Sequence, residues 1–156
     1  MLPKNENPSN PRWGRAAAIL FNQGKIALIE RHRPRRHYFV LPGGGIETGE
    51  TPEQAVVREV REELGLEVAV ERLIALRRLH GMLEYYFLVQ ATGGQFGTGD
   101  GPEMGSRADT EEGSFTPIWM SLAETARYTV HPQALIAWLA QIEPDQIPQG
   151  VWQFEE

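Results

Sequence analysis

Short apolar runs and turn residues alternate along the chain, and this pattern predicts strands with two helices among them. Strands are expected over 16–21 and 25–30, joined as a hairpin by the turn residues 22–24, and over 37–41. A second strand pair is predicted over 67–79 and 83–91, around the turn residues 80–81. A short strand over 118–121 and a last helix over 131–142 follow. This order predicts an α/β architecture, with helices packed on both faces of a mixed β-sheet.

A helix is predicted between residues 52 and 64, because both of its ends are marked. Thr51 supplies a hydroxyl N-cap, Pro52 suits the first helical position, and Gln54 can complete a capping box. Gly65 provides the stop. The helix has one apolar stripe to bury, formed by Ala55, Val56, Val57, Val60 and Leu64.

Glu59, Glu62 and Glu63 are three or four residues apart, so they gather on a different face of this helix. Like charges at this spacing destabilise a helix by roughly 0.2–0.5 kcal/mol per pair, and the helix dipole disfavours anions in the last turn. A bound cation would offset both costs. Carboxylate oxygens without nearby Cys or paired His favour Mg²⁺ or Mn²⁺ over Zn²⁺. The alternative is a solvated acidic face with Arg58 and Arg61 as partners.

Three glycines, Gly43 to Gly45, follow the strand predicted over 37–41 and lead towards this helix. Glycines permit positive φ angles and close backbone approach, so the predicted loop can turn carbonyls or amides towards a ligand. An ordinary flexible turn is the alternative. The loop then continues through Glu47 and Glu50.

Together the loop and helix resemble the signature of the Nudix hydrolases, in the run GGIETGETPEQAVVREVREELGL. The matching residues are Gly44, Glu50, Arg58, Glu59, Glu62, Glu63 and Gly65. The resemblance is sharp over 37–66 and looser over 14–142. It implies the Nudix fold, an α/β/α sandwich with a mixed β-sheet.

The resemblance also implies roles for the residues of the motif. Glu59, Glu62 and Glu63 would be metal ligands and catalytic groups, and the carbonyl of Gly43 would join the metal shell. Arg58 would orient a carboxylate. Substrate would contact Gly44 and Gly45, and structural support would come from Glu47, Glu50 and Gly65.

A further glutamate, as metal ligand or general base, is expected near the end of the glycine-rich loop predicted over 92–113. The resemblance makes Glu112 the first candidate and Glu111 the second. Glu84, which precedes the loop, is the third and weakest candidate. An acidic mobile loop without such a role is the alternative.

Four arginines at 31, 33, 35 and 36 precede the motif, with His32 and His37 among them. A basic rim steers anions, so Arg31 and Arg36 are candidates for binding substrate phosphates. A solvated loop is the alternative reading of this segment.

Length and charge limit the remaining choices. The 156 residues suit one domain, expected over 13–142, after a flexible tail over 1–12 and before a C-terminal extension over 143–156. The net charge of -6 argues against a duplex nucleic-acid surface. The chain has no cysteine and no run long enough for a membrane span, so a cytoplasmic protein is expected. The extension leaves a homodimer open.

The predicted activity is Mg²⁺-dependent hydrolysis of a phosphoanhydride in a nucleoside diphosphate linked to another moiety, with two or more ions. The leading substrate is a nucleoside triphosphate, including oxidised or non-standard ones, cleaved to monophosphate and pyrophosphate. ADP-ribose or a nucleotide sugar comes next; Gly81 stands where ADP-ribose enzymes tend to have proline. Dinucleoside-polyphosphate enzymes often have a tyrosine where this chain has Met82, Leu83 and Glu84. A nucleotide-binding sensor without catalysis would usually have lost residues of the motif, and none is lost here.

Overall fold

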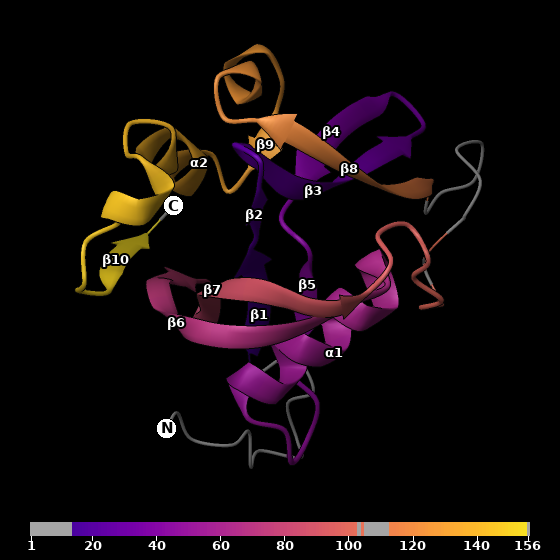
Figure 1. Ribbon diagram of the computed structural model, residues 1–156, viewed down its shortest axis with the longest axis horizontal. Coiled ribbons are helices and arrows are strands. Elements are labelled where there is room, and N and C mark those ends of the chain that lie inside the picture. Colours follow the sequence, from indigo (N-terminus) through magenta and orange to yellow (C-terminus); the bar gives the residue numbers. More distant parts are fainter. Residues whose placement is uncertain (1–13, 103, 105–112, 156) are drawn as a thin grey trace.

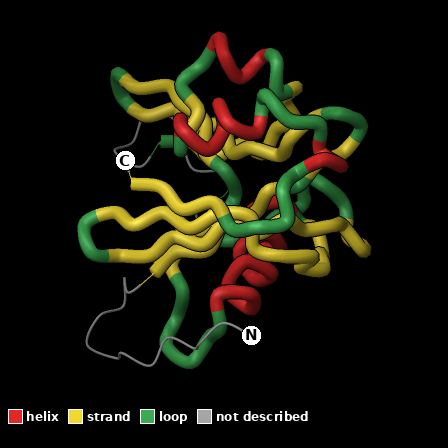
Figure 2. The backbone as a smooth tube through the Cα atoms, turned by 90° about the vertical axis from the view of Figure 1, so that its left-hand side faces the viewer, coloured by secondary structure: helices red, strands yellow, loops and turns green. Residues whose placement is uncertain are grey.

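Two mixed five-stranded sheets form the body of the protein, and Figures 1 and 2 show them as separate layers. The computed structural model describes residues 14–102, 104 and 113–155. The first sheet has the order β10 (Trp152–Glu155), β6 (Leu66–Leu79), β7 (Met82–Gly94), β1 (Gly14–Ile19), β5 (Gly43–Gly45). The second has the order β2 (Phe21–Asn22), β3 (Lys25–Arg33), β4 (Arg36–Val40), β9 (Val130–His131), and β8 (Ser114–Ser121) also pairs with β3.

The two α-helices lie on opposite sides of β1. Ala16 and Ala18 point into a core shared with α1 (Pro52–Leu64), whereas Ala17 and Ile19 point into a core shared with α2 (Gln133–Leu139). This division follows from the alternation of side chains along a strand. Two 3-10 helices, Glu124–Arg127 and Pro144–Gln146, flank α2 in the chain. The predicted α/β class, with helices on both sides of a mixed sheet, is confirmed, although the strands divide between two sheets.

The helix α1 begins and ends where the sequence predicts. The Thr51 hydroxyl accepts a hydrogen bond from the Gln54 amide at 3.1 Å, and the Gln54 side chain accepts one from the Thr51 amide at 2.9 Å. Gly65 ends the helix in the left-handed conformation, with φ of 77°. Along the predicted stripe Ala55, Val56, Val60 and Leu64 are buried, and Val57 is partly buried.

The first predicted hairpin is wrong in one respect, because the chain changes sheets at Leu20. β1 ends at Ile19 and pairs with β7 and β5 in the first sheet, whereas β2 pairs with β3 in the second. The predicted turn is present, with positive φ at Gln23 and Gly24. Leu20 is buried among the residues of the α1 core, so a continuous apolar run hides the change of sheet.

The three glycines form a short strand rather than the predicted loop. β5 pairs antiparallel with β1, and Gly45, Gly44 and Gly43 lie opposite Arg15, Ala16 and Ala17. A Cβ on Gly43 would lie 2.4 Å from the Ala16 carbonyl oxygen, a distance that real side chains do not adopt. The glycines thus allow β5 to approach β1 closely, next to α1.

Long-range pairing sets the observed ends of two other elements. β8 starts four residues before the predicted strand, because it pairs with β3 from His32↔Ser114 to Lys25↔Ser121. The last helix begins later than predicted, since His131 belongs to β9, which pairs in parallel with β4, and it ends at Leu139 rather than at 142. The second strand pair is confirmed, as β6 and β7, although β7 continues to Gly94, into the segment predicted as loop.

The C-terminal extension packs on its own chain. β10 pairs in parallel with β6, and Trp152 stacks on Trp138 with 4.9 Å between the ring centroids. The Arg72 guanidinium donates hydrogen bonds to the carbonyls of Ile147 and Pro148, both at 2.8 Å. The homodimer expected as an alternative stays a prediction.

The glycine-rich segment after β7 folds against the end of α1. The amide of Gly97 donates to the Leu64 carbonyl and that of Gly101 to the Glu62 carbonyl, both at 2.9 Å. A Cβ on Gly99 would lie 2.4 Å from the Glu62 carbonyl oxygen. The segment 95–102 therefore lies beside the predicted metal-binding face of the helix.

Within the described residues, no helix has both the length and the apolar character needed to cross a membrane.

Replacing Gly65 by alanine tests how tightly segment 95–102 packs on the helix. Its φ is positive, and its Cβ would lie 2.2 Å from the Thr98 hydroxyl and 2.7 Å from the Gln95 carbonyl. Gly49→Ala is a matched control, because Gly49 has φ of +86° with nothing within 4 Å of its Cβ. We expect Gly49→Ala to cost about 1–2 kcal/mol of unfolding free energy and Gly65→Ala clearly more, measured by urea unfolding. Equal losses would mean that the segment yields without cost.

Candidate active site

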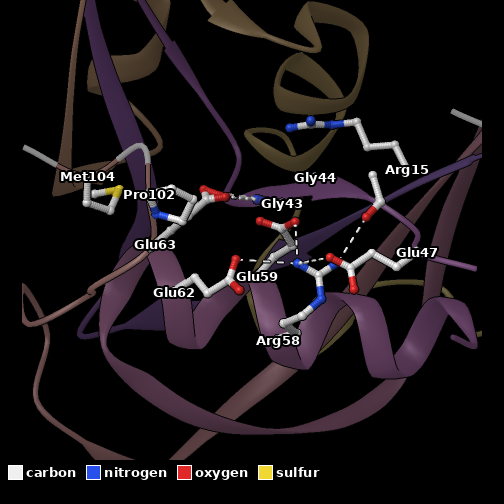
Figure 3. A pocket seen from close by; sticks show the side chains of 12 residues that line it. Arg15, Gly43, Gly44, Glu47, Arg58, Glu59, Glu62, Glu63, Pro102 and Met104 are labelled. Atoms are coloured by element: carbon white, nitrogen blue, oxygen red, sulfur yellow. Dashed lines mark hydrogen bonds and ion pairs between the residues drawn. The ribbon is translucent and has the colours of Figure 1, made fainter. Parts of the chain in front are cut away.

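A cavity of about 350 Å³ opens where α1, β5 and segment 95–102 meet (Figure 3). The three glutamates predicted as metal ligands point into it from the helix. The other residues that line the cavity are Arg15, Gly43, Gly44, Gly45, Glu47, Arg58, Gly101, Pro102 and Met104. The structure therefore gathers the predicted helix and glycine residues around one space.

Glu63 is the most deeply placed of the three glutamates. Its side chain accepts a hydrogen bond from the Gly43 amide at 3.1 Å, and the residue is 6% exposed. Burial, and then the neighbouring charge of Glu59, raise the pKa of the Glu63 carboxyl well above its usual value, although Arg15 opposes this rise. Two carboxylates thus face each other in a poorly solvated place.

Glu59 occupies the space that Gly44 leaves free. A Cβ on Gly44 would lie 2.3 Å from a carboxylate oxygen of Glu59, so only glycine allows this side chain its place. Burial raises the pKa of the Glu59 carboxyl, and the charge and hydrogen bond of Arg58 oppose the rise.

Arg58 holds the acidic side chains around it in place. Its guanidinium donates to Glu50 at 2.8 and 3.1 Å, to Glu59 at 2.9 Å and to Glu62 at 3.4 Å, and to the Gly45 carbonyl at 3.0 Å. Burial alone would raise the pKa of Glu50, but hydrogen bonds from Arg58 and the Glu47 amide lower it overall. These contacts put Arg58 where it can orient the carboxylates and tie Glu50 to it, and the roles expected of both residues stay predictions.

The donor set fits a hard divalent cation. Glu59, Glu62 and Glu63 supply carboxylate oxygens, the kind of ligand that Mg²⁺ and Mn²⁺ prefer. Burial, and for Glu63 also the charge of Glu59, keeps these two carboxyls unfavourable as a charged pair, although Arg58 opposes the effect at Glu59 and Arg15 at Glu63. A cation at this place would relieve that cost, and Gly43 lies beside Glu63, where the resemblance puts a carbonyl ligand.

The remaining walls of the cavity were not predicted from the sequence. Arg15 extends from β1 on one side, and Pro102 and Met104 close the other side beside the glutamates (Figure 3). Arg15 reaches the site because its backbone lies opposite Gly45 in the β1–β5 pairing. An arginine next to an alanine run was the only sequence signal, and it does not indicate a site.

A second cavity of about 310 Å³ adjoins the first through Arg15, which lines both. Arg31 and Tyr38 lie on its wall, and its other lining residues are Ala17, Val40, Leu41, Arg77, Glu84, Tyr86, His131 and Pro132. Arg31 lies 3.5 Å from the ring centroid of Phe115. Arg36 packs over Tyr38 at 4.5 Å and is absent from the described lining of both cavities.

Of the three candidate glutamates outside the motif, the structure describes Glu84 but not Glu111 or Glu112. Glu84 is buried and accepts hydrogen bonds from Arg77 at 2.6 Å and from the Tyr86 hydroxyl. It lines the second cavity and is not among the residues that line the first. Glu111 and Glu112 lie outside the described residues, and the prediction for them stays open.

Removing the charge of Glu63 should stabilise the metal-free protein. A carboxyl with a raised folded-state pKa destabilises the fold once the pH exceeds the unfolded pKa, about 4.3 for Glu. We expect Glu63→Gln in EDTA at pH 7 to gain on the order of 1 kcal/mol, or about 2–4 °C in Tm, and to lose this gain near pH 4. Mg²⁺ should raise the Tm of the parent protein more than that of the variant. A lower Tm for metal-free Glu63→Gln would show that Arg15 and Gly43 outweigh the cost of burial.

Known proteins resemble this chain in sequence and in fold. Among curated proteins, an ADP-ribose pyrophosphatase of Methanocaldococcus jannaschii is 39% identical over 89 residues, 53% of this chain and 53% of that protein. An 8-oxo-dGTP diphosphatase of Escherichia coli K12 is 46% identical over 54 residues, 33% of this chain and 42% of that protein. The matched part of the chain thus spans about half or less of these relatives.

Solved structures share the fold over almost the whole chain. A NUDIX hydrolase from Nitrosomonas europaea has a TM-score of 0.69 at 20% identity, covering 100% of this chain and 89% of its own. An ADP-ribose pyrophosphatase from Streptococcus suis has a TM-score of 0.61 at 19% identity, covering 90% and 98%. The model of the NUDIX domain matches residues 11–141. With the motif, the fold and this match in agreement, the chain belongs to the Nudix family.

Proposed function

We propose that the protein is a Mg²⁺-dependent hydrolase that cleaves a phosphoanhydride bond in a nucleoside diphosphate linked to another moiety. The observation that best supports this is the gathering of Glu59, Glu62 and Glu63 in one cavity, held by Arg58. Arg15 adds a positive side chain to the same cavity. Such a place suits a metal-bound anion better than a neutral ligand.

Each residue of the site has a part in this proposal. Glu59, Glu62, Glu63 and the Gly43 carbonyl would hold the cation, with Mn²⁺ as a substitute. When bound, Mg²⁺ supplies charge neutralisation of the diphosphate and a water of lowered pKa. Arg58 keeps the carboxylates in place, and Arg15 is positioned to contact a phosphate oxygen.

A glutamate takes the proton of the attacking water. Glu112 remains the first candidate for this base and Glu111 the second, with the carboxylates of the motif as the described alternatives. Glu84 is disfavoured, because Arg77 and Tyr86 already engage its carboxylate in the second cavity.

The leading substrate is a nucleoside triphosphate, oxidised or non-standard forms included, which would give the monophosphate and pyrophosphate. An 8-oxo-dGTP diphosphatase among the relatives favours this class, and an ADP-ribose pyrophosphatase favours the alternative of ADP-ribose or a nucleotide sugar. The second cavity, next to the first and lined in part by Tyr38 and Tyr86, suits the nucleoside. A non-catalytic nucleotide sensor is disfavoured because the motif is complete.

An activity panel with a matched variant tests the proposal. Nucleoside triphosphates, oxidised purine triphosphates, ADP-ribose, nucleotide sugars and dinucleoside polyphosphates are incubated with the protein and Mg²⁺, and every product is identified. Glu62→Gln should lower kcat at least about a hundredfold with little change in Tm, since Glu62 is 35% exposed in its side chain. Glu67→Gln is the control, because the Glu67 side chain is exposed and accepts its hydrogen bonds from Arg61, outside the cavity. Binding without cleavage across the panel would favour the sensor.

The second cavity is tested through Arg31, one of the arginines that line it. Arg31→Ala should raise KM about tenfold, or about 1.4 kcal/mol, with a smaller effect on kcat, because the nucleoside side of the substrate loses a wall. Arg36→Ala is the comparison, since Arg36 packs on the same Tyr38 ring without lining the cavity. Steady-state kinetics decide between them. A larger effect from Arg36 would point to Arg36, rather than Arg31, as the substrate-binding residue of the pair predicted from the sequence.

A further inference from the structure

Two histidines and a glutamate converge on the hairpin formed by β3 and β4, outside both cavities. The Nε2 atoms of His32 and His37 lie 3.1 and 2.7 Å from the same carboxylate oxygen of Glu30. The two imidazole rings stack with centroids 4.0 Å apart and an angle of 8° between their planes. One ligand atom from each of the three residues lies within 4.8 Å of the others.

The register of the hairpin produces this convergence. His32 and His37 are directly opposite partners in the β3–β4 ladder, one pair before the last pair Arg33↔Arg36. Glu30 is two residues before His32, so all three side chains share one face of the sheet. Three ligands are thus supplied by two strands joined through a tight turn, which limits how far they can separate.

The neighbouring arginines lie on the other face. Arg31 and Arg36 pack over the ring of Tyr38, at 5.7 and 4.5 Å, and Tyr38 alternates with His37 along β4. On the face of the histidines, the next ring along β4 is Phe39, 5.1 Å from His37. Alternation therefore separates Arg31 and Arg36 from the histidines, so these two arginines repel a cation next to Glu30 less than the sequence suggests.

We propose that Glu30, His32 and His37 form a binding site for a divalent transition-metal ion such as Zn²⁺. Two imidazoles and one carboxylate match the ligands that Zn²⁺, Ni²⁺ and Cu²⁺ take in proteins, and are unlike the all-oxygen set that suits Mg²⁺. The ion replaces the contacts that now join both Nε2 atoms to Glu30. The side chains of His32 and His37 are 48% and 41% exposed, so the ion can enter from solvent and keep water in its open positions.

The proposed metal site is separate from both cavities described above. Arg31 and Tyr38 line the second cavity, whereas the three ligands lie on the reverse face of the same two strands. An ion bound there ties β3 to β4 near the turn of the hairpin. Its occupancy thereby restrains the strands whose other face forms part of the second cavity, and it does so whether or not the proposed hydrolysis is correct.

Zinc binding is measured by equilibrium dialysis on protein without a histidine tag, in excess Mg²⁺ so that hard-cation sites are occupied. We expect the double variant His32→Ala/His37→Ala to bind one Zn²⁺ fewer per chain than the parent. His80→Ala is the matched control, because it removes a histidine from the β6–β7 turn, and it should bind as the parent does. Glu62→Gln should also retain this equivalent. Equal zinc stoichiometry in the double variant and the parent would overturn the proposal.

A second measurement does not depend on stoichiometry. The chain has four histidines, so paramagnetic Ni²⁺ can be followed through their imidazole NMR signals. The signals of His32 and His37 should broaden first, before those of His80 and His131, and Glu30→Gln should weaken the effect. Simultaneous broadening of all four would show surface binding without a site. Unchanged far-UV circular dichroism of the variants excludes unfolding as the cause of a loss.

Discussion

The interaction on which the site depends is the multiple hydrogen bonding of Arg58. One guanidinium contacts Glu50, Glu59, Glu62 and the Gly45 carbonyl, and so joins the loop before α1, the helix and β5. A fixed planar fork is suited to this, since it satisfies several acceptors at once. The acidic face can then exist in a folded chain before any cation arrives, although Glu59 and Glu63 remain costly. The acidic face therefore carries a cost in folding stability that a bound cation would offset.

Backbone proximity is the second condition. β5 lies against β1 because Gly43 has no side chain, and Glu59 fits because Gly44 has none. The same pairing brings Arg15 to the edge of the cavity. These glycines therefore matter mainly because they have no side chain, rather than because they are flexible. The space left free lets β5, the Glu59 carboxylate and Arg15 lie close together.

How far the sequence predicts this protein depends on whether a signal is local. The limits of α1 follow from Thr51, Gln54 and Gly65, all within the helix or next to it, and the glutamate spacing fixes which face they share. The change of sheet at Leu20 could not be read, because both sheets require apolar residues there. The positions of Arg15 and of the cluster of Glu30, His32 and His37 follow from strand register. Register depends on which strands pair, and that cannot be read from a single sequence. The wall formed by Pro102 and Met104 depends on a segment with no periodicity.

Segment 95–102 is held against α1 by its backbone, and this has a consequence for the wall of the cavity. Its anchors to α1 are backbone amides on backbone carbonyls at Glu62 and Leu64, so they set the path of the segment without specifying most of its side chains. The acidic floor of the cavity depends on the side chains of Glu59, Glu62 and Glu63. The wall that segment 95–102 contributes depends mainly on the path of its backbone. Substitutions that keep the course can alter what the wall offers to a ligand while the acidic floor stays intact. The ligand preference of the cavity can thus change through this wall without any change in the carboxylates.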